Sequence, residues 1–231
     1  MTLQQHDLSV QKKSDALDGR SIALCVTGSI AAVETVKLAR ELRRHGAEVR
    51  AYLTPGGEKF ITPLSLQWAT ARPVVTELSG NAEHIVSADA VLVAPASFHT
   101  INKVAIGMAD NAVTTLIASA WGARIPVIFV PAMHLSLSQN PVYQQNIARL
   151  KAEPTIHFLE PMWEEGKAKL PEPESIVAQV SHVLARTQAA CHFEGKSAMP
   201  PRPLSGKKIL ITAGPTEGPL DPVRHLSNFS T

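Results

Sequence analysis

Small and hydroxyl-bearing residues stand at or shortly after the ends of three of the apolar runs in this sequence. Gly28 and Ser29 follow the first run, Thr54 ends the second, and Ser97 and Thr100 follow the third. Glycine lets backbone N–H groups approach a ligand closely, and the helix expected after the first turn presents its positive dipole end to an anion. Together these residues predict a phosphate-binding site, although a Gly-Ser turn taken alone is more often a tight bend that binds nothing.

The apolar runs that would position these residues are typical of buried parallel strands. They cover residues 22–26, 48–54, 88–95, 127–131 and 156–159. Stretches with helical spacing of apolar residues cover 30–45, 60–70, 101–121 with a break at 107–111, 141–151 and 175–184. This alternation predicts an α/β fold, a doubly wound parallel sheet in a three-layer α/β/α arrangement. Because parallel strands share one carboxyl edge, Gly28, Thr54 and Ser97 are expected at the same edge.

The composition indicates a soluble protein with one main domain. The 231 residues are 45% hydrophobic and 18% charged, and the formal net charge is +2. Scattered basic residues argue against a nucleic-acid partner, and no apolar stretch is long enough to indicate a membrane span. The two cysteines, Cys25 and Cys191, form neither a disulfide framework nor a metal-ligand pattern. We therefore expect a cytoplasmic protein without a metal site.

Changes in composition predict the domain boundaries. Residues 1–19 are polar and aperiodic, which predicts a flexible tail, and residues 20–185 contain the predicted strands and helices. Within them, residues 164–173 are polar and bounded by proline, which predicts a surface loop or flap. Residues 186–205 have the composition of a linker, and a further strand is expected over 207–214.

Five motifs, in this order, resemble those of the flavin-containing cysteine decarboxylases. They are VTGSIAA at 26–32, FITPLSL at 60–66, APAS at 94–97 with Thr100, GMADN at 107–111 and PAMH at 131–134. The resemblance covers roughly residues 20–185 and is strongest to the branch that acts on phosphopantothenoylcysteine. Residues 206–228 resemble the opening of phosphopantothenate–cysteine ligase, so residues 206–231 are interpreted as the truncated start of a ligase domain.

The resemblance implies a Rossmann-like relative of flavodoxin that binds FMN at subunit contacts. It also implies a homo-oligomer, either a trimer or a dodecamer. The residues that it places near the cofactor are Gly28, Ser29, Ile30, Thr54, Ser97, Thr100, Asn111 and Met133. For Asn111 a helix cap, and for Met133 simple core packing, are the alternative roles.

The resemblance also implies catalytic and substrate-binding residues. His84 matches the histidine that serves as a base near the substrate thiol, and imidazole titrates near neutrality. His134 stands where the family has an asparagine that binds the substrate carboxylate, and its N–H group could take over that role. Lys167 and Lys169 are candidates for pairing with the substrate phosphate. A bound flavin would accept electrons from the thiol-bearing carbon, which makes the decarboxylation feasible.

One departure from the family pattern keeps the outcome of the reaction open. The flap of the family carries a cysteine that returns a proton, whereas residues 164–169 here read EEGKAK. Either Glu164 or Glu165 supplies that proton, or the reaction stops at the oxidised enethiol. The expected function is FMN-dependent decarboxylation of 4′-phosphopantothenoylcysteine to 4′-phosphopantetheine in coenzyme A biosynthesis. The alternatives are an oxidative peptidyl-cysteine decarboxylase and a non-catalytic flavin-binding regulatory protein.

Overall fold

A computed structural model describes residues 8–194, 217–219 and 225–227 of the chain. The chain divides into two units, residues 1–190 and residues 191–231, which are described separately. In the second unit the described strands β9 (Glu217–Pro219) and β10 (His225–Ser227) pair antiparallel. The strand expected over 207–214 lies outside the described residues. No described helix is long and apolar enough to cross a membrane.

The first unit is built on a parallel sheet whose central strands are buried on both faces. Its strands are β1 (Ser21–Val26), β2 (Glu48–Leu53), β3 (Ala90–Ala96), β4 (Val127–Pro131) and β6 (Ile156–Phe158), in the order β2-β1-β3-β4-β6. Every residue of β3 and β4 is buried. Such continuous apolar runs suit a sheet covered on both sides. The predicted doubly wound parallel sheet is confirmed.

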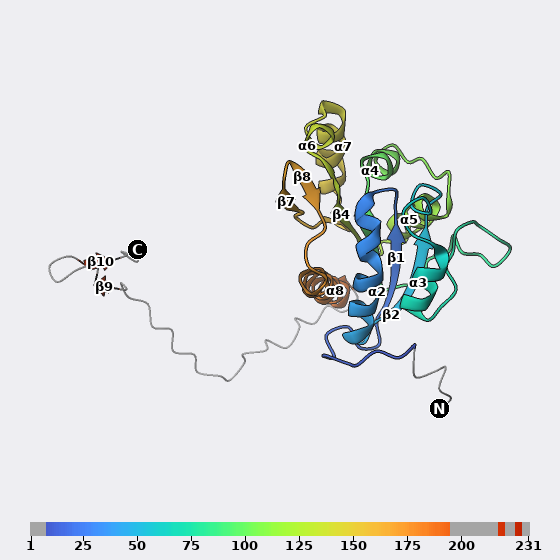
Figure 1. Cartoon of the computed structure of the whole chain (residues 1–231), viewed down its shortest axis with the longest axis horizontal. Coiled ribbons are helices and arrows are strands. Elements are labelled where there is room, and N and C mark those ends of the chain that lie inside the picture. Colours follow the sequence, from blue (N-terminus) through green and yellow to red (C-terminus); the bar gives the residue numbers. More distant parts are fainter. Residues whose placement is uncertain (1–7, 195–216, 220–224, 228–231) are drawn as a thin grey trace. The chain divides into compact units, whose positions relative to one another are not determined.

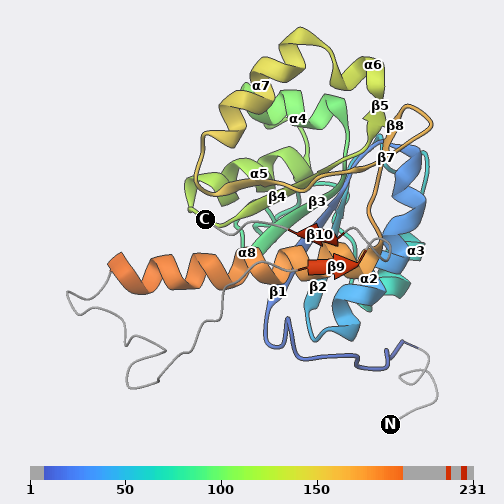
Figure 2. The same cartoon turned by 90° about the vertical axis from the view of Figure 1, so that its left-hand side faces the viewer.

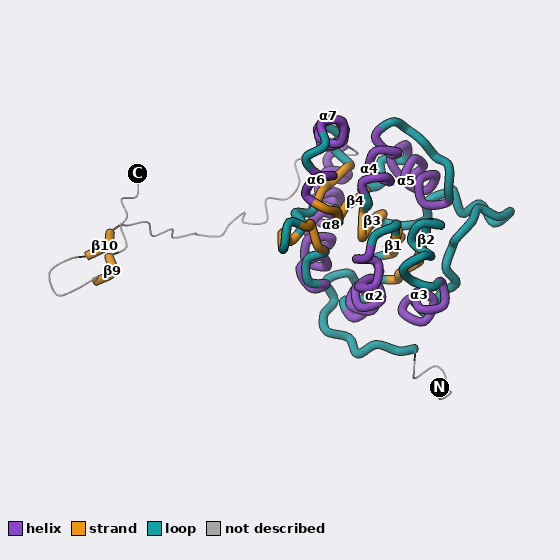
Figure 3. Tube along the Cα trace, turned by 45° about the horizontal axis from the view of Figure 1, so that its top comes forward, coloured by secondary structure: helices purple, strands orange, loops and turns teal. Residues whose placement is uncertain are grey.

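Helices cover the two faces of this sheet and complete the three layers (Figure 1). They are η1 (Ile30–Glu34), α2 (Thr35–Arg44), α3 (Pro63–Thr70), α4 (Phe98–Ala105), α5 (Ala112–Gly122), α6 (Leu135–Ser138), α7 (Pro141–Lys151) and α8 (Pro173–Glu194). One hydrophobic cluster joins the sheet to α2, α3 and α8, and a second joins it to α4, α5 and α7. Figure 3 shows α2 and α3 on one side of the central strands and α4 and α5 on the other.

The order of the strands places a crevice between the carboxyl ends of β1 and β3. Strand β1 pairs with both β2 and β3, so the chain leaves β1 in one direction along the sheet and later continues in the other. Ligands of open α/β sheets bind at such a reversal point. Buried Thr27 joins the two strand ends here, because its Oγ1 donates to the Pro95 carbonyl (2.7 Å) and accepts from the Ser97 N–H (2.9 Å).

The predicted flap loop is instead a β-hairpin in a small antiparallel sheet. Strands β7 (Met162–Glu164) and β8 (Lys167–Lys169) pair with each other, and β8 also pairs with β5 (Met133–His134). Glu165 and Gly166 form the turn with φ angles of 50° and 70°. A two-residue turn with both φ values positive matches the twist of a hairpin. The polar composition of these residues concealed the strand pairing from sequence analysis.

The prediction of a flexible tail is wrong for residues 8–19. Leu17 is fully buried in the core cluster that contains α2 and α8. The backbone N–H groups of Lys13 and Leu17 donate to the carbonyls of Arg44 (2.7 Å) and His45 (2.8 Å) at the end of α2. Lys13 Nζ also contacts the carboxylate of buried Glu41 at 2.6 Å. The segment packs because it binds the free carbonyl groups at the C-terminus of α2, which an aperiodic sequence does not reveal.

The predicted linker is wrong over residues 186–194, because α8 continues to Glu194. Figure 2 shows α8 as one long helix. Residues 186–194 contain no proline or glycine, so no local signal stops the helix before Gly195. Residues 195–205, the remainder of the predicted linker, lie outside the described residues.

Candidate functional site

A cavity of about 320 Å³ lies at the crevice between β1 and β3, and we call it the rim cavity. Its lining residues are Gly28, Thr54, Pro55, Gly56, Ser97, His99, Thr100, Lys103, Asp110 and Asn111. Five of the eight predicted cofactor-contacting residues are therefore brought together here. Gly28, Thr54 and Ser97 follow the ends of β1, β2 and β3, as the shared edge of a parallel sheet requires. Thr100 lies in α4, and Asn111 is the N-cap of α5.

The first turn of the rim cavity has a glycine where two backbone segments approach closely. A Cβ atom added to Gly28 would lie 3.1 Å from the carbonyl carbon of Gly56. Ser29 follows as the N-cap of η1, and its side chain accepts a hydrogen bond from the Ala31 N–H at 3.4 Å. The turn thus passes close to the Gly56 backbone with no side chain at position 28.

Three hydroxyl groups of the rim cavity are held in place by local hydrogen bonds. Ser97 Oγ and Thr100 Oγ1 lie 3.1 Å apart, and Ser97 caps the N-terminus of α4. Thr54 Oγ1 accepts from the Gly57 N–H at 3.1 Å. Each hydroxyl retains hydrogen-bonding capacity for a ligand, since a hydroxyl offers one donor and two acceptor positions.

Asn111 contributes to the cavity wall chiefly as a helix cap. Its Oδ1 accepts from the N–H groups of Val113 (3.0 Å) and Thr114 (3.1 Å), and its Nδ2 donates to Asp110. Asp110, which the GMADN motif places beside it, also pairs with Lys103 from α4. Sequence analysis did not identify Lys103 as a site residue. It stands seven residues before Asp110, on the other side of the break between α4 and α5.

A second and larger cavity of about 690 Å³ lies beside the rim cavity, and we call it the hairpin groove. Its walls are η1, the start of α2, strands β5 and β8, and the first turn of α8. The predicted site residues that line it are Ser29, Ile30, Met133, His134, Lys167 and Lys169. Gly28 lines one cavity and Ser29 the other, so the Gly-Ser turn stands between the two.

His134 points one ring nitrogen, Nδ1, at its own chain. It is the N-cap of α6, and its Nδ1 accepts from the Ser136 N–H at 3.2 Å and lies 2.8 Å from Ser136 Oγ. A backbone N–H can only donate, so Nδ1 carries no proton in this arrangement. In this arrangement Nε2 is the ring nitrogen that can donate an N–H to a ligand.

The two lysines of β8 differ in their partners. Lys169 Nζ pairs with Glu164 at 2.5 Å, and this hydrogen bond lowers the pKa of the Glu164 carboxyl. Lys167 stands opposite His134 in the strand register and forms no ion pair with any described residue. Lys167 is thus the more available cation of the pair.

His84 lines neither cavity and is exposed in the loop between α3 and β3. That loop projects from the body of the unit on the side of α3 (Figure 1). The neighbouring Glu83 is held by Ser79, whose side-chain hydrogen bond lowers the pKa of the Glu83 carboxyl to about 2. Within one chain, the structure does not bring His84 together with the other predicted site residues.

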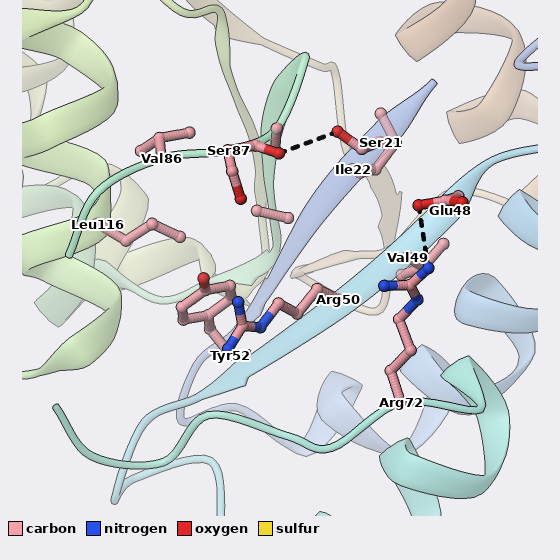
Figure 4. Close-up of a pocket in the computed structure, with 12 residues that line it drawn as sticks. Ser21, Ile22, Glu48, Val49, Arg50, Tyr52, Arg72, Val86, Ser87 and Leu116 are labelled. Carbon is pink, nitrogen blue, oxygen red and sulfur yellow. Dashed lines mark hydrogen bonds and ion pairs between the residues drawn. The ribbon is translucent and has the colours of Figure 1, made fainter. Parts of the chain in front are cut away.

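A third cavity, of about 190 Å³, lies beside the starts of β1 and β2 (Figure 4). Arg72 and Glu48 pair at 3.0 Å at its edge, and Ser21 Oγ donates to the Ser87 carbonyl at 3.2 Å. None of the predicted site residues lines this cavity. Its charged groups are mostly engaged with each other, so we assign it no chemistry.

Curated relatives align along nearly the whole chain. The coenzyme A biosynthesis bifunctional protein CoaBC of Thermococcus kodakarensis is 42% identical over 226 residues, which is 95% of this chain and 52% of that protein. CoaBC of Methanocaldococcus jannaschii is 35% identical over 95% of this chain and 51% of that protein. The chain therefore spans about half the length of these relatives.

Solved structures share the fold of the first unit. A PPC decarboxylase mutant complexed with pantothenoylaminoethenethiol aligns with a TM-score of 0.59 and 24% identity, covering 70% of this chain and 96% of that one. The FMN-dependent cysteine decarboxylase TvaF from thioviridamide biosynthesis aligns with a TM-score of 0.60 and 28% identity, covering 72% and 99%.

Two family models match the chain. Residues 204–231 match the C-terminal domain of DNA/pantothenate metabolism flavoproteins. Residues 10–185 match the model described as Flavoprotein, and this match includes both cavities of the carboxyl edge. Because that match covers most of the 231 residues, the chain belongs to the flavoprotein family.

Proposed function

We propose that the chain catalyses the FMN-dependent decarboxylation of 4′-phosphopantothenoylcysteine to 4′-phosphopantetheine, a step of coenzyme A biosynthesis, in the cytoplasm. One observation carries the proposal: the Gly28–Ser29 turn lies between the rim cavity and the larger hairpin groove, so a cofactor and a substrate can bind side by side. The names of the bifunctional relatives and of the decarboxylase neighbours support the same substrate class. Residues 20–185 would form this domain, and residues 206–231 would belong to a ligase domain.

The rim cavity suits the phosphate end of FMN. Gly28, Thr54, Ser97 and Thr100 supply a close backbone approach and hydroxyl donors around a space of about 320 Å³. Ser29, Ile30 and Met133 line the adjoining groove, where the rest of the cofactor and the substrate would meet. When bound, the flavin supplies an acceptor for electrons from the thiol-bearing carbon of the substrate.

The hairpin groove offers two donors to an anionic substrate. His134 would donate its Nε2 proton to the substrate carboxylate, because Ser136 occupies Nδ1. Lys167, the register partner of His134, would bind the substrate phosphate, with Lys169 as a second cation that Glu164 holds. Both groups fix the substrate by charge-assisted hydrogen bonds and carry out no bond-breaking step.

A saturated thiol would form when the reduced flavin returned its electrons to the intermediate, and the proton added at that step needs a source other than cysteine. Strands β7 and β8 contain no cysteine, and Cys25, the free cysteine among the described residues, is buried in β1. Glu164 is engaged by Lys169, whose hydrogen bond lowers the pKa of the Glu164 carboxyl, whereas Glu165 forms no ion pair with a described residue and lines the groove. We therefore assign the proton-donor role to Glu165.

The isolated position of His84 favours a site shared between copies of the chain. We propose a homo-oligomer, a trimer or a dodecamer, in which the projecting loop of one chain brings His84 to the groove of another. His84 would there act as the base near the substrate thiol. Exposed apolar residues on η1 and α3, namely Ile30, Val33, Leu64 and Trp68, are consistent with such contacts.

The test is a comparison of two substrates on the FMN-loaded protein. Carbon dioxide release is measured with 4′-phosphopantothenoylcysteine and with a peptide that ends in cysteine. We expect turnover of the phosphorylated substrate, and turnover of the peptide alone would establish the peptidyl-cysteine alternative instead. A protein that binds FMN but releases no carbon dioxide from either substrate would contradict both enzymatic functions.

A further inference from the structure

The rim cavity contains a lysine whose charge has no role in the site described so far. Lys103, in the last turn of α4, lines the cavity with a side chain that is 17% exposed, and its Nζ donates to Asp110 Oδ2. We propose that Lys103 provides the positive charge that binds the cofactor phosphate, and that Asp110 holds the lysine in the cavity until the phosphate takes its place. This inference rests on the proposed placement of the phosphate in the rim cavity.

The charges of the cavity wall explain why a phosphate needs this lysine. Apart from His99, the groups that carry charge among the lining residues are Lys103 and Asp110, and they form a pair. A phosphate entering this space would face the Asp110 carboxylate unless a cation stood between the two anions. Hydroxyl groups such as those of Thr54 and Ser97 can donate hydrogen bonds but cannot offset that repulsion.

The two members of the pair differ in how firmly the chain holds them. Asp110 Oδ1 accepts from Asn111 Nδ2 (3.0 Å) and Thr114 Oγ1 (3.3 Å), and the Asp110 N–H donates to Thr114 Oγ1 (3.0 Å). Lys103 has no hydrogen-bond partner for Nζ other than Asp110 among the described residues. Since a lysine stem is flexible and its ammonium carries three donors, Lys103 can turn toward a phosphate while Asp110 stays in place.

The test compares FMN with riboflavin, which lacks the phosphate. Binding of each flavin to the apo form of the full chain is followed by quenching of flavin fluorescence. Lys103→Met should weaken FMN binding by about tenfold to a hundredfold, the loss expected for one charge-assisted hydrogen bond, and leave riboflavin binding unchanged. Asp110→Asn keeps the oxygen that Asn111 and Thr114 bind, removes the competing charge, and should tighten FMN binding.

Three further variants separate this role from a structural one. Lys103→Arg keeps the charge and should retain most of the preference for FMN. The double variant Lys103→Met with Asp110→Asn leaves no unpaired charge and should still bind FMN more weakly than the wild type. Lys151→Met removes an exposed lysine that lines neither cavity and should change nothing.

Three results would overturn the proposal. The first is an unchanged ratio of FMN to riboflavin affinity in Lys103→Met. The second is weaker FMN binding by Asp110→Asn, which would show that the carboxylate supports the phosphate site rather than occupying the lysine. The third is a wild-type protein with equal affinity for both flavins, which would contradict the phosphate site itself. Because only binding is measured, none of these outcomes depends on whether the protein decarboxylates its proposed substrate.

Discussion

Replacing Thr27 by valine should loosen the crevice between β1 and β3. Thr27 is fully buried, and its hydroxyl bonds both the Pro95 carbonyl at 2.7 Å and the Ser97 N–H at 2.9 Å. Valine has nearly the same shape, so packing is kept while both backbone groups lose this partner. A buried polar group that loses its partner costs about 1–3 kcal/mol, and the added methyl group recovers part of this.

The free energy of unfolding should therefore fall by about 2–4 kcal/mol in Thr27→Val. For a unit of this size, that loss corresponds to a melting temperature lower by about 5–15 °C. Urea unfolding of the apo-protein, followed by far-UV circular dichroism, measures the change without stabilisation by bound cofactor. Binding of FMN should weaken as well, because the Ser97 backbone that Thr27 holds forms part of the rim cavity.

Thr27→Ser is the matched control. It keeps the hydroxyl and removes one methyl group, so its cost should be about 1 kcal/mol. A free energy of unfolding for Thr27→Val within about 0.5 kcal/mol of the wild-type value is typical of surface substitutions. That result would show that Thr27 does not join the two strand ends as described.

Three further substitutions test other parts of the structure. Gly28→Ala places a Cβ 3.1 Å from the Gly56 backbone and should weaken FMN binding about tenfold or more, whereas Gly80→Ala, with nothing within 4 Å, should bind FMN normally in a fluorescence titration. At Glu41, burial raises the carboxyl pKa but hydrogen bonds from Lys13 and Arg44 outweigh it, so the pKa is lowered. The stabilisation by Glu41 is then complete above its unfolded pKa of about 4.3 and is lost as the pH falls through the lower folded pKa. In urea titrations at a series of pH values, the free energy of unfolding of Glu41→Gln should be lower than that of the wild type at pH about 7 and should depend less on pH in the acid range. An equal dependence of the free energy of unfolding on pH in both proteins would contradict this. Lys167→Met should raise the KM for phosphopantothenoylcysteine more than it lowers kcat, and a selective loss of kcat would refute a binding role.

The sheet could be predicted from the sequence because its central strands are buried on both faces. Continuous apolar runs such as those of β3 and β4 have few other interpretations when helical stretches separate them. The shared edge then followed from the parallel arrangement, which is why Gly28, Thr54 and Ser97 were expected together. Here the local composition and the tertiary structure both favour the same parallel sheet.

The remaining features depend on pairings between distant residues, which local patterns do not encode. The segment around Leu17 packs only because α2 ends nearby with free carbonyl groups. The β7–β8 hairpin depends on pairing with Met133 and His134, about thirty residues earlier in the chain. Lys103 is a candidate for phosphate binding because the break between α4 and α5 places Asp110 within hydrogen-bonding distance of its Nζ. His84 was singled out by the family resemblance, and within a single chain it does not line the groove.

The mass of the product formed from 4′-phosphopantothenoylcysteine tests the central claim most directly. The FMN-loaded protein is incubated with this substrate, and the product is identified by mass spectrometry. Our account predicts 4′-phosphopantetheine, which differs from the substrate by the loss of carbon dioxide alone. A product that has lost carbon dioxide and two further hydrogens would be the enethiol, and it would contradict the protonation step assigned to Glu165. Unchanged substrate in the presence of bound FMN would contradict the proposed function itself.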